Sequence, residues 1–250
     1  ELFRGRDIFV RIDTGQNHGH HQHVRTGGVH SKFGVPLFEL DELRAAATAA
    51  GATVVGLHAH TGSGNFALHN WTDTAATLVE AARTFGTVRV LDLGGGLGVP
   101  ERAGALPLDL EALDAALAGL RAAAPGLEFW LEPGRYVVAA AGVLLARVTQ
   151  LKGKGAKRYL GIATGMNSLI RPALYGAYHE IVNLTRLEES ATQLFDVVGP
   201  ICESGDFLGH DRRLPASGEG DVLLIANAGA YGHAMSSGYN LRPPAEELSL

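Results

Sequence analysis

The first half of the chain alternates between two hydrophobic periods, and this alternation limits the fold more than any other feature. Short apolar runs typical of strands are followed by stretches whose apolar residues recur about every 3.6 positions, as they do in helices. The expected strands are 9–12, 54–60, 88–93 and 129–131, and the expected helices are 39–50, 72–85 and 110–123. Strands that alternate with helices predict parallel βα units, and we count four of them.

The unusual residues of this half stand where predicted strands end. They are His60, the glycines 94–96 and the segment 132–135. Enzymes built on a (β/α)8 barrel carry their sites on the rim formed by the carboxyl ends of the strands. Because a barrel needs eight βα units, we expect half of such a barrel, with its first half outside these 250 residues. The chain begins at Glu1 without a methionine, which also suggests part of a longer protein, although processing would give the same start.

The second half has a different pattern, with little helical periodicity between its apolar runs. The expected strands are 143–151, 158–163, 180–187, 193–198 and 221–226. We therefore predict an α/β chain of two domains. Residues 1–140 form the C-terminal half of a (β/α)8 barrel, and residues 141–250 form a domain that is mostly β.

Composition narrows the possible functions. The net charge of −5 argues against a nucleic-acid partner, because phosphates attract proteins with a basic excess. The longest apolar run, 136–146, has about 11 residues where a bilayer needs about 20, so we expect no membrane span. The single cysteine, Cys202, excludes an intramolecular disulfide and favours a reducing, cytoplasmic location.

Two segments at the predicted strand ends indicate an anion site. The glycines 94–96 let backbone N–H groups approach a phosphate closely, although a tight turn after a strand would use the same residues. Arg135 would add a bidentate charge, and Glu132 would place a carboxylate on the same rim. A ring cofactor with a basic nitrogen needs such a carboxylate to stay protonated. A surface ion pair between Glu132 and Arg135 is the alternative.

Histidines occur in two groups. His58 and His60 alternate along one strand and so share a face, where His60 suits stacking on a flat ring and His58 suits packing. No third ligand stands at a usual spacing, so we predict no metal site there. The second group lies in a Gly- and Gln-rich loop without Cys or carboxylate, and we predict no specific metal site there either. It consists of His18, His20, His21 and His23.

Six motifs, in order along the chain, resemble those of the fold-type III decarboxylases that use pyridoxal 5′-phosphate (PLP). They are Gly-Leu-His-Ala-His-Thr-Gly-Ser (56–63), Leu-Asp-Leu-Gly-Gly-Gly-Leu-Gly (91–98), Glu-Pro-Gly-Arg (132–135), Gly-Met-Asn-Ser-Leu-Ile-Arg-Pro-Ala-Leu-Tyr (165–175), Cys-Glu-Ser-Gly-Asp (202–206) and Ala-Gly-Ala-Tyr-Gly (228–232). The resemblance covers essentially the whole chain and is strongest to diaminopimelate decarboxylases. Residues 165–182 and the His-rich loop resemble the decarboxylase half of the bifunctional aspartate kinase/diaminopimelate decarboxylases. The resemblance implies a partial PLP-binding barrel of the alanine racemase type, followed by a β-rich C-terminal domain.

The resemblance also implies how the cofactor is held. His60 stacks on the PLP ring and counts among the catalytic residues, and Glu132 pairs with the pyridine nitrogen, which keeps the ring an effective electron sink. Tyr231 contacts both cofactor and substrate. The other cofactor-binding residues are Ser63, Gly94, Gly95, Gly96, Gly134 and Arg135, mostly around the phosphate.

The implied substrate is meso-2,6-diaminopimelate, which loses CO2 to give L-lysine. Its far end is a zwitterion, so it needs a cation and an anion close together, and Arg171 and Glu203 supply them. Tyr175 assists Arg171. Arg135 and Tyr231 also lie at the substrate, and Cys202 returns a proton to Cα. Cys202 and Glu203 reach the site of the other subunit, which implies a homodimer with shared active sites. A buried small hydrophobe for Cys202 and a loop salt bridge for Arg171 are the alternatives.

One element of the family's site is missing from the sequence. The four lysines, at 32, 152, 154 and 157, do not fall in the Tyr-Ala-x-Lys-Ala type of motif to which the family attaches PLP. Without that amine we expect these 250 residues alone to be inactive, and half a barrel to fold poorly. Two other functions stay open. One is decarboxylation of another basic amino acid or polyamine precursor, and the other is a non-catalytic PLP-binding or dimerisation module.

Overall fold

The computed structural model describes residues 2–15 and 31–249, and their contacts divide the chain into two compact units. The first unit comprises residues 1–99 and 107–136, and the second comprises residues 100–106 and 137–250. In the described part of the chain, no helix is long and apolar enough to cross a bilayer.

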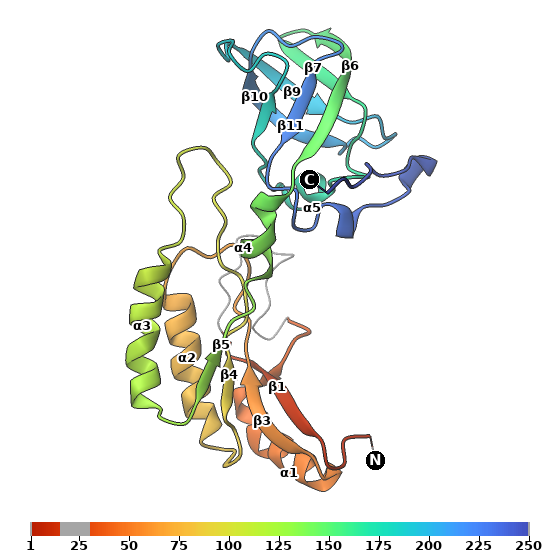
Figure 1. Ribbon diagram of the computed structural model, residues 1–250. Helices are drawn as coiled ribbons and strands as arrows, with labels where there is room; N and C mark the ends of the chain where they lie inside the picture. The colour runs from red at the N-terminus through yellow and green to blue at the C-terminus, as the bar shows by residue number, and fades with distance from the viewer. Residues whose placement is uncertain (1, 16–30, 250) are drawn as a thin grey trace. The chain divides into compact units, whose positions relative to one another are not determined.

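A five-stranded sheet forms the centre of the first unit, in the order β2-β1-β3-β4-β5. The strands are β1 (Asp7–Asp13), β2 (Val35–Pro36), β3 (Thr53–His58), β4 (Val90–Asp92) and β5 (Glu128–Trp130). The helices are α1 (Leu40–Ala50), α2 (His69–Ala82), α3 (Leu110–Ala123) and the short α4 (Gly134–Val138), of which α2 and α3 lie side by side (Figure 1). Every strand pair in this sheet is parallel, which confirms the predicted βα units.

The strand register sorts side chains onto the two faces of this sheet. Val10, Leu57 and Leu91 are partners across β1, β3 and β4, and all three are buried in the core that includes Trp71 of α2. In the next row, Arg11 is the partner of His58, and His58 is the partner of Asp92. Because successive side chains of a strand point to opposite faces, this polar row lies on the face away from the helices.

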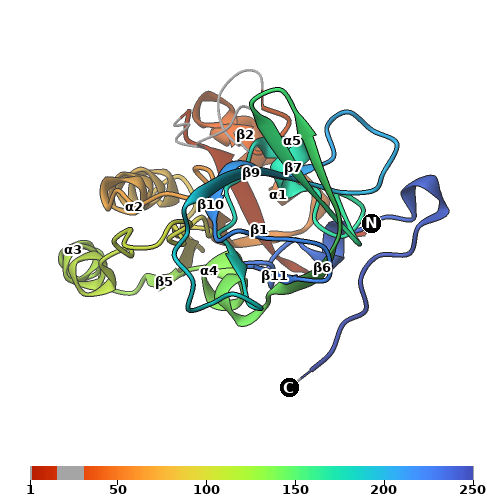
Figure 2. The same cartoon turned by 90° about the horizontal axis from the view of Figure 1, so that it is seen from above.

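The second unit is a six-stranded sheet in the order β10-β9-β7-β6-β11-β8. Its strands are β6 (Leu144–Lys154), β7 (Lys157–Ile162), β8 (Ile181–Asn183), β9 (Gln193–Val198), β10 (Phe207–Leu214) and β11 (Val222–Ile225). The strands β8 and β10, at the two ends of this order, also contact each other, so the sheet curls toward closure (Figure 2). The remaining elements are α5 (Arg171–Tyr175) and the 3-10 turns Leu37–Glu39, Ala139–Ala141, His233–Met235 and Tyr239–Leu241.

Several elements differ from the sequence-based expectation. The short elements β2, α4 and α5 were not expected, and neither was the strand β10, whose polar run breaks the two-residue alternation of a strand. Asp211 takes a φ of 48°, and the register against β9 shifts there. The predicted strand 180–187 is too long, since β8 ends at Asn183, whose side-chain oxygen accepts from the N–H of Arg186 at 3.2 Å and turns the chain. The helix predicted at 72–85 runs three residues earlier, from His69 to Ala82.

Trp71 anchors α2 in the core of the first unit, since its side chain is 1% exposed. We expect Trp71→Ala to lower the free energy of unfolding by about 3–5 kcal/mol, the usual loss for a large buried aromatic residue. Trp130→Ala, the same change at a side chain that is 48% exposed, should cost less than half as much. Urea unfolding of the two variants measures both losses, and equal losses would contradict this account of the core.

Candidate active site

Three loops of the first unit lie side by side because the sheet's hydrogen bonds continue past the strand ends. The N–H of Ala59 donates to the carbonyl of Asp92 at 2.9 Å, and the N–H of Glu132 donates to the carbonyl of Gly94 at 3.0 Å. The loops brought together are 59–65, 93–98 and 131–135. These are the loops in which the sequence places the cofactor-binding residues of this unit.

The glycine loop after β4 is packed against both neighbouring loops. Gly94 and Gly96 have φ values of 69° and 87°, which favour glycine. A Cβ atom on Gly95 would collide with the carbonyl oxygen of Glu132, and one on Gly96 with the carbonyl oxygen of Gly62. The glycines are therefore required by close backbone approach.

Two of the three glycine N–H groups are already engaged by side chains of the protein. The N–H of Gly94 donates to Oδ1 of Asp92 at 2.9 Å, and the N–H of Gly95 donates to Nδ1 of His60 at 3.2 Å. Among the described residues, the N–H of Gly96 has no such acceptor. Of these three glycines, only Gly96 therefore offers its N–H to an anion, whereas the sequence suggested that all three would.

His60 is held as a neutral imidazole. Burial, followed by the charges of Arg11 and His58, holds the pKa of His60 below its ordinary value of 6.5, with Glu132 opposing the shift. Since Nδ1 accepts a hydrogen bond from Gly95, the proton of the neutral ring must sit on Nε2. The ring is fixed in orientation and tautomer, as stacking on a flat cofactor requires.

Ser63 and Arg135 meet between two of these loops, since Nη2 of Arg135 donates to Oγ of Ser63. A guanidinium and a hydroxyl at the same point suit a phosphate. Gly134, just before Arg135, donates its N–H to the carbonyl of Glu132 at 2.8 Å. A Cβ on Gly134 would meet nothing within 4 Å, so space does not require glycine there.

Glu132 is held by a partner to which sequence reasoning gave only a packing role. Its Oε2 lies 3.2 Å from Nε2 of His58, and its side chain is 56% exposed. One ligand atom from each of His58, Asp92 and Glu132 lies within 4.8 Å of the other two, a spacing that metal sites also show. Arg11 is also on this face and interacts electrostatically with Glu132. The sequence places Arg11 and Asp92 on strands, but only the register between those strands brings both into one row with His58.

In the second unit, Arg171 is oriented by a histidine that sequence reasoning missed. Its guanidinium is buried, and Nη1 lies 3.0 Å from Nε2 of His179. The other nitrogen of that ring, Nδ1, lies 2.8 Å from the carbonyl oxygen of Ala226 and must donate to it. Nε2 is therefore the acceptor for Arg171. Tyr175 stands four residues later on α5, and so on the same side of the helix as Arg171.

The other predicted residues of this unit lie at exposed positions. Cys202 and Glu203 occupy the exposed loop before β10, where the N–H of Cys202 donates to Oδ1 of Asn240 at 2.8 Å. The buried carboxylate of Asp206 secures this loop by accepting from the N–H of Ile201 at 2.8 Å. Tyr231 has a φ of 61° and is 49% exposed.

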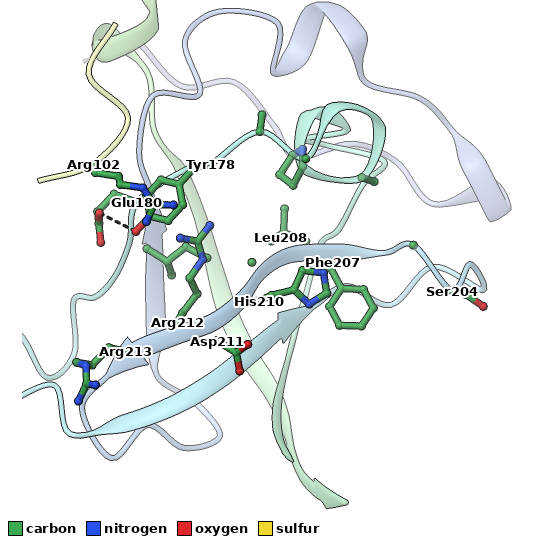
Figure 3. Close-up of a pocket in the computed structure, with 17 residues that line it drawn as sticks. Arg102, Tyr178, Glu180, Ser204, Phe207, Leu208, His210, Asp211, Arg212 and Arg213 are labelled. Carbon is green, nitrogen blue, oxygen red and sulfur yellow. Dashed lines mark hydrogen bonds between the residues drawn. The ribbon is translucent and has the colours of Figure 1, made fainter. Parts of the chain in front are cut away.

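A cavity of about 700 Å³ lies in the second unit next to α5 and the loop before β10 (Figure 3). In this cavity the guanidinium groups of Arg102 and Arg212 lie over the ring of Tyr178, 3.8 and 3.7 Å from its centroid. The phenol donates to Glu180 at 3.0 Å. The cavity borders the segments that hold Arg171 and Glu203, but neither residue lines it.

The lysines and the His-rich loop complete the set of residues singled out from the sequence. Lys152, Lys154 and Lys157 lie on the β6–β7 hairpin, where Lys157 pairs with Asp211 at 2.6 Å. Lys32 lies over the ring of Phe33, 5.2 Å from its centroid. The histidines at 18, 20, 21 and 23 fall outside the described residues.

The pyridoxal binding domain of the pyridoxal-dependent decarboxylases matches residues 1–139, and the C-terminal sheet domain of the same family matches residues 90–229. The chain belongs to this family. The predicted fold class, a PLP-binding barrel domain followed by a β domain, is thereby confirmed, and so is the predicted cofactor.

Within the pyridoxal-dependent decarboxylases, the chain is similar to diaminopimelate decarboxylases. It is 42% identical over 258 residues to that of Methanothermobacter thermautotrophicus, covering 98% of this chain and 60% of the relative. It is 39% identical to that of Haemophilus influenzae, covering 99% and 60%. The crystal structure of the Helicobacter pylori diaminopimelate decarboxylase complexed with L-lysine superposes with a TM-score of 0.87 at 33% identity, covering 97% of this chain and 61% of that chain. The chain thus spans about 60% of the length of these relatives, and the likeness to the bifunctional enzymes stays a prediction.

The residues present fit PLP. The Ser63–Arg135 pair and the N–H of Gly96 suit its phosphate, and the neutral ring of His60 suits its flat face. Glu132, an exposed carboxylate with one oxygen engaged by His58, suits the basic ring nitrogen. These groups come from three adjoining loops of one rigid sheet, so their spacing is set before any ligand arrives.

Gly95→Ala should disrupt this arrangement, because the new methyl group overlaps the carbonyl oxygen of Glu132. We expect a loss of about 1–3 kcal/mol in the free energy of unfolding, as for other overpacked sites, and a loss of PLP affinity. Gly119→Ala is the matched control, because Gly119 lies in α3 with open space around it. That change should stabilise the protein by about 0.5–1 kcal/mol and leave PLP binding intact. Normal PLP binding by Gly95→Ala would show that the loops adapt.

His60 should also make stability depend on pH. Its folded pKa is lowered, so between that value and about 6.5 the unfolded chain binds more protons, and stability falls as pH decreases. His60→Asn keeps an acceptor for Gly95 but removes this titration. We expect the free energy of unfolding to fall less in the variant than in the parent between pH 7 and 5.5. The two slopes should differ by at most about 1.4 kcal/mol per pH unit. Urea unfolding at several pH values measures the slope, and a slope equal to the parent's would contradict the buried neutral state.

Proposed function

We propose that the protein to which these residues belong catalyses the PLP-dependent decarboxylation of meso-2,6-diaminopimelate to L-lysine and CO2. The observation that carries the proposal is the meeting of His60, Ser63, Glu132 and Arg135 on one rim, in a chain similar to diaminopimelate decarboxylases. Since the chain spans about 60% of the length of those relatives, the activity is proposed for the whole protein.

The rim residues bind and orient the cofactor. When bound, PLP supplies an electron sink adjoining the Cα of the substrate. Ser63, Arg135 and the N–H of Gly96 bind the phosphate, and the neutral ring of His60 packs on the cofactor ring. Glu132 receives the proton-bearing ring nitrogen. Gly94, Gly95 and Gly134 shape the loops, with their own N–H groups engaged within the protein.

The second unit supplies the groups that recognise the far end of the substrate. Arg171, oriented by His179, and Tyr175 bind the distal carboxylate, and Glu203 binds the distal ammonium group. Arg135 and Tyr231 contact the reacting end, and the Cys202 thiol donates a proton to Cα after CO2 leaves. A substrate with an ammonium group but no carboxylate at its far end would not form this contact with Arg171 and Tyr175.

We further propose a homodimer in which Cys202 and Glu203 serve the site of the partner subunit. Their place on an exposed loop, secured at its base by the buried carboxylate of Asp206, supports this role. We also propose that the boundary between the two domains lies between residues 140 and 141, and that the protein is cytoplasmic.

The proposal predicts that Glu203→Ala in the whole protein lowers kcat/KM for meso-diaminopimelate at least tenfold, because the distal ammonium loses its counter-charge. The absorbance of bound PLP should be unchanged. Glu219→Ala, the same change at an exposed position of the β10–β11 loop, should have no effect. Steady-state release of CO2 measures both variants.

The same assay separates the alternatives. Faster turnover of ornithine or arginine than of meso-diaminopimelate would favour a decarboxylase of another basic amino acid. PLP binding without turnover of any of these substrates would indicate a binding or dimerisation module instead.

A further inference from the structure

A row of polar side chains crosses the face of the first sheet that points away from the helices. Arg11, His58 and Asp92 are partners on β1, β3 and β4, and Glu132 follows β5. His58 contacts the last member of the row, because its Nε2 lies 3.2 Å from Oε2 of Glu132, and one ligand atom of Asp92 lies within 4.8 Å of both residues. The row therefore ends at the carboxylate that the proposed function assigns to the ring nitrogen.

We propose that His58 is a positioning residue for Glu132. Its Nε2–H donates to Oε2 and fixes the plane of the carboxylate, which leaves Oε1 to face the ring nitrogen of the cofactor. This inference rests on the proposed function, because both assign the ring nitrogen of PLP to Glu132.

The need for such a partner follows from the exposure of Glu132. A glutamate side chain that is 56% exposed samples several rotamers, and fixing it costs conformational entropy at the moment of binding. The side chain of His58 is only 17% exposed and lies at the end of β3, so it moves much less. A hydrogen bond from this rigid group holds Glu132 in place before the cofactor binds.

The neighbours of His58 keep it in a donating position. Asp92 is buried, and its Oδ1 is held at 2.9 Å by the N–H of Gly94, so a fixed negative charge lies near the imidazole. Arg11 adds a positive charge to the row, and Nη2 of Arg11 is buried without an acceptor among the described residues. Arg11 therefore acts on Glu132 through its charge, and His58 supplies the directional contact.

A pair of ring phosphates tests this assignment in the protein at its natural length, with the cofactor removed. The first, 4-deoxypyridoxine 5′-phosphate, has the ring nitrogen and phosphate but no aldehyde, so it needs no lysine. The second, benzyl phosphate, has no ring nitrogen. His58→Leu should weaken binding of the first about tenfold, as expected for loss of a hydrogen bond to a charged group. It should change binding of the second less than twofold, and calorimetry measures both.

Three controls separate positioning from a general structural role. His58→Gln, which keeps an N–H donor, should restore most of the affinity for the ring with nitrogen. His210→Leu, the same change as His58→Leu at an exposed histidine of the second unit, should alter neither affinity. In a Glu132→Gln background, His58→Leu should have no further effect on the affinity ratio of the two phosphates, because both changes act through one contact.

The outcomes that overturn the inference are distinct from those that overturn the proposed function. Equal weakening of both phosphates by His58→Leu, or no weakening of either, removes the positioning role alone. Affinity that depends on a chelator-removable divalent cation would make His58, Asp92 and Glu132 metal ligands, and would also remove it. If the unaltered protein binds neither phosphate, the proposed function fails and the inference fails with it.

Discussion

The register of the parallel strands in the first unit determines both its core and its site. Hydrogen bonds between β1, β3 and β4 place Val10, Leu57 and Leu91 in one row against the helices, and the next row on the opposite face. A slip of one residue in any of these strands would exchange the two rows, because side chains alternate between faces. The apolar contacts that stabilise the sheet therefore also keep His58 and Asp92 close to Glu132.

The core and the rim are further connected through single side chains that belong to both. Trp71 is buried among the helix-facing residues, yet its Nε1–H donates to the carbonyl oxygen of Gly95 at 3.2 Å. Asp92 ends β4 and accepts from Gly94 in the following loop. In the second unit, the buried His179 has the same double role, since it joins the backbone of Ala226 to Arg171. In each case a buried residue fixes the position of a loop or side chain that belongs to the candidate site.

Sequence reasoning recovered the parts of the molecule that depend on local pattern. The parallel strands and three long helices follow from hydrophobic periodicity, and the strand-end loops from glycine and charged motifs. It missed β10, because a bulge at Asp211 breaks the alternation on which the prediction depends. It also missed the roles of Arg11, Asp92 and His179, since these come from pairings between residues far apart in the chain. The charge state of His60 and the engaged N–H group of Gly95 depend on contacts between neighbouring loops, which no single motif contains.

The packing of Gly95 against Glu132 also bears on how such a rim can change over generations. The space next to the α-carbon of Gly95 is filled by the carbonyl oxygen of the loop that carries Glu132. Gly95 cannot gain a side chain unless the loop that carries Glu132 moves in the same step. Libraries that vary one position at a time would therefore rate Gly95 as intolerant of change. Paired substitutions in the two loops are the accessible route by which this rim could come to hold a cofactor of different shape.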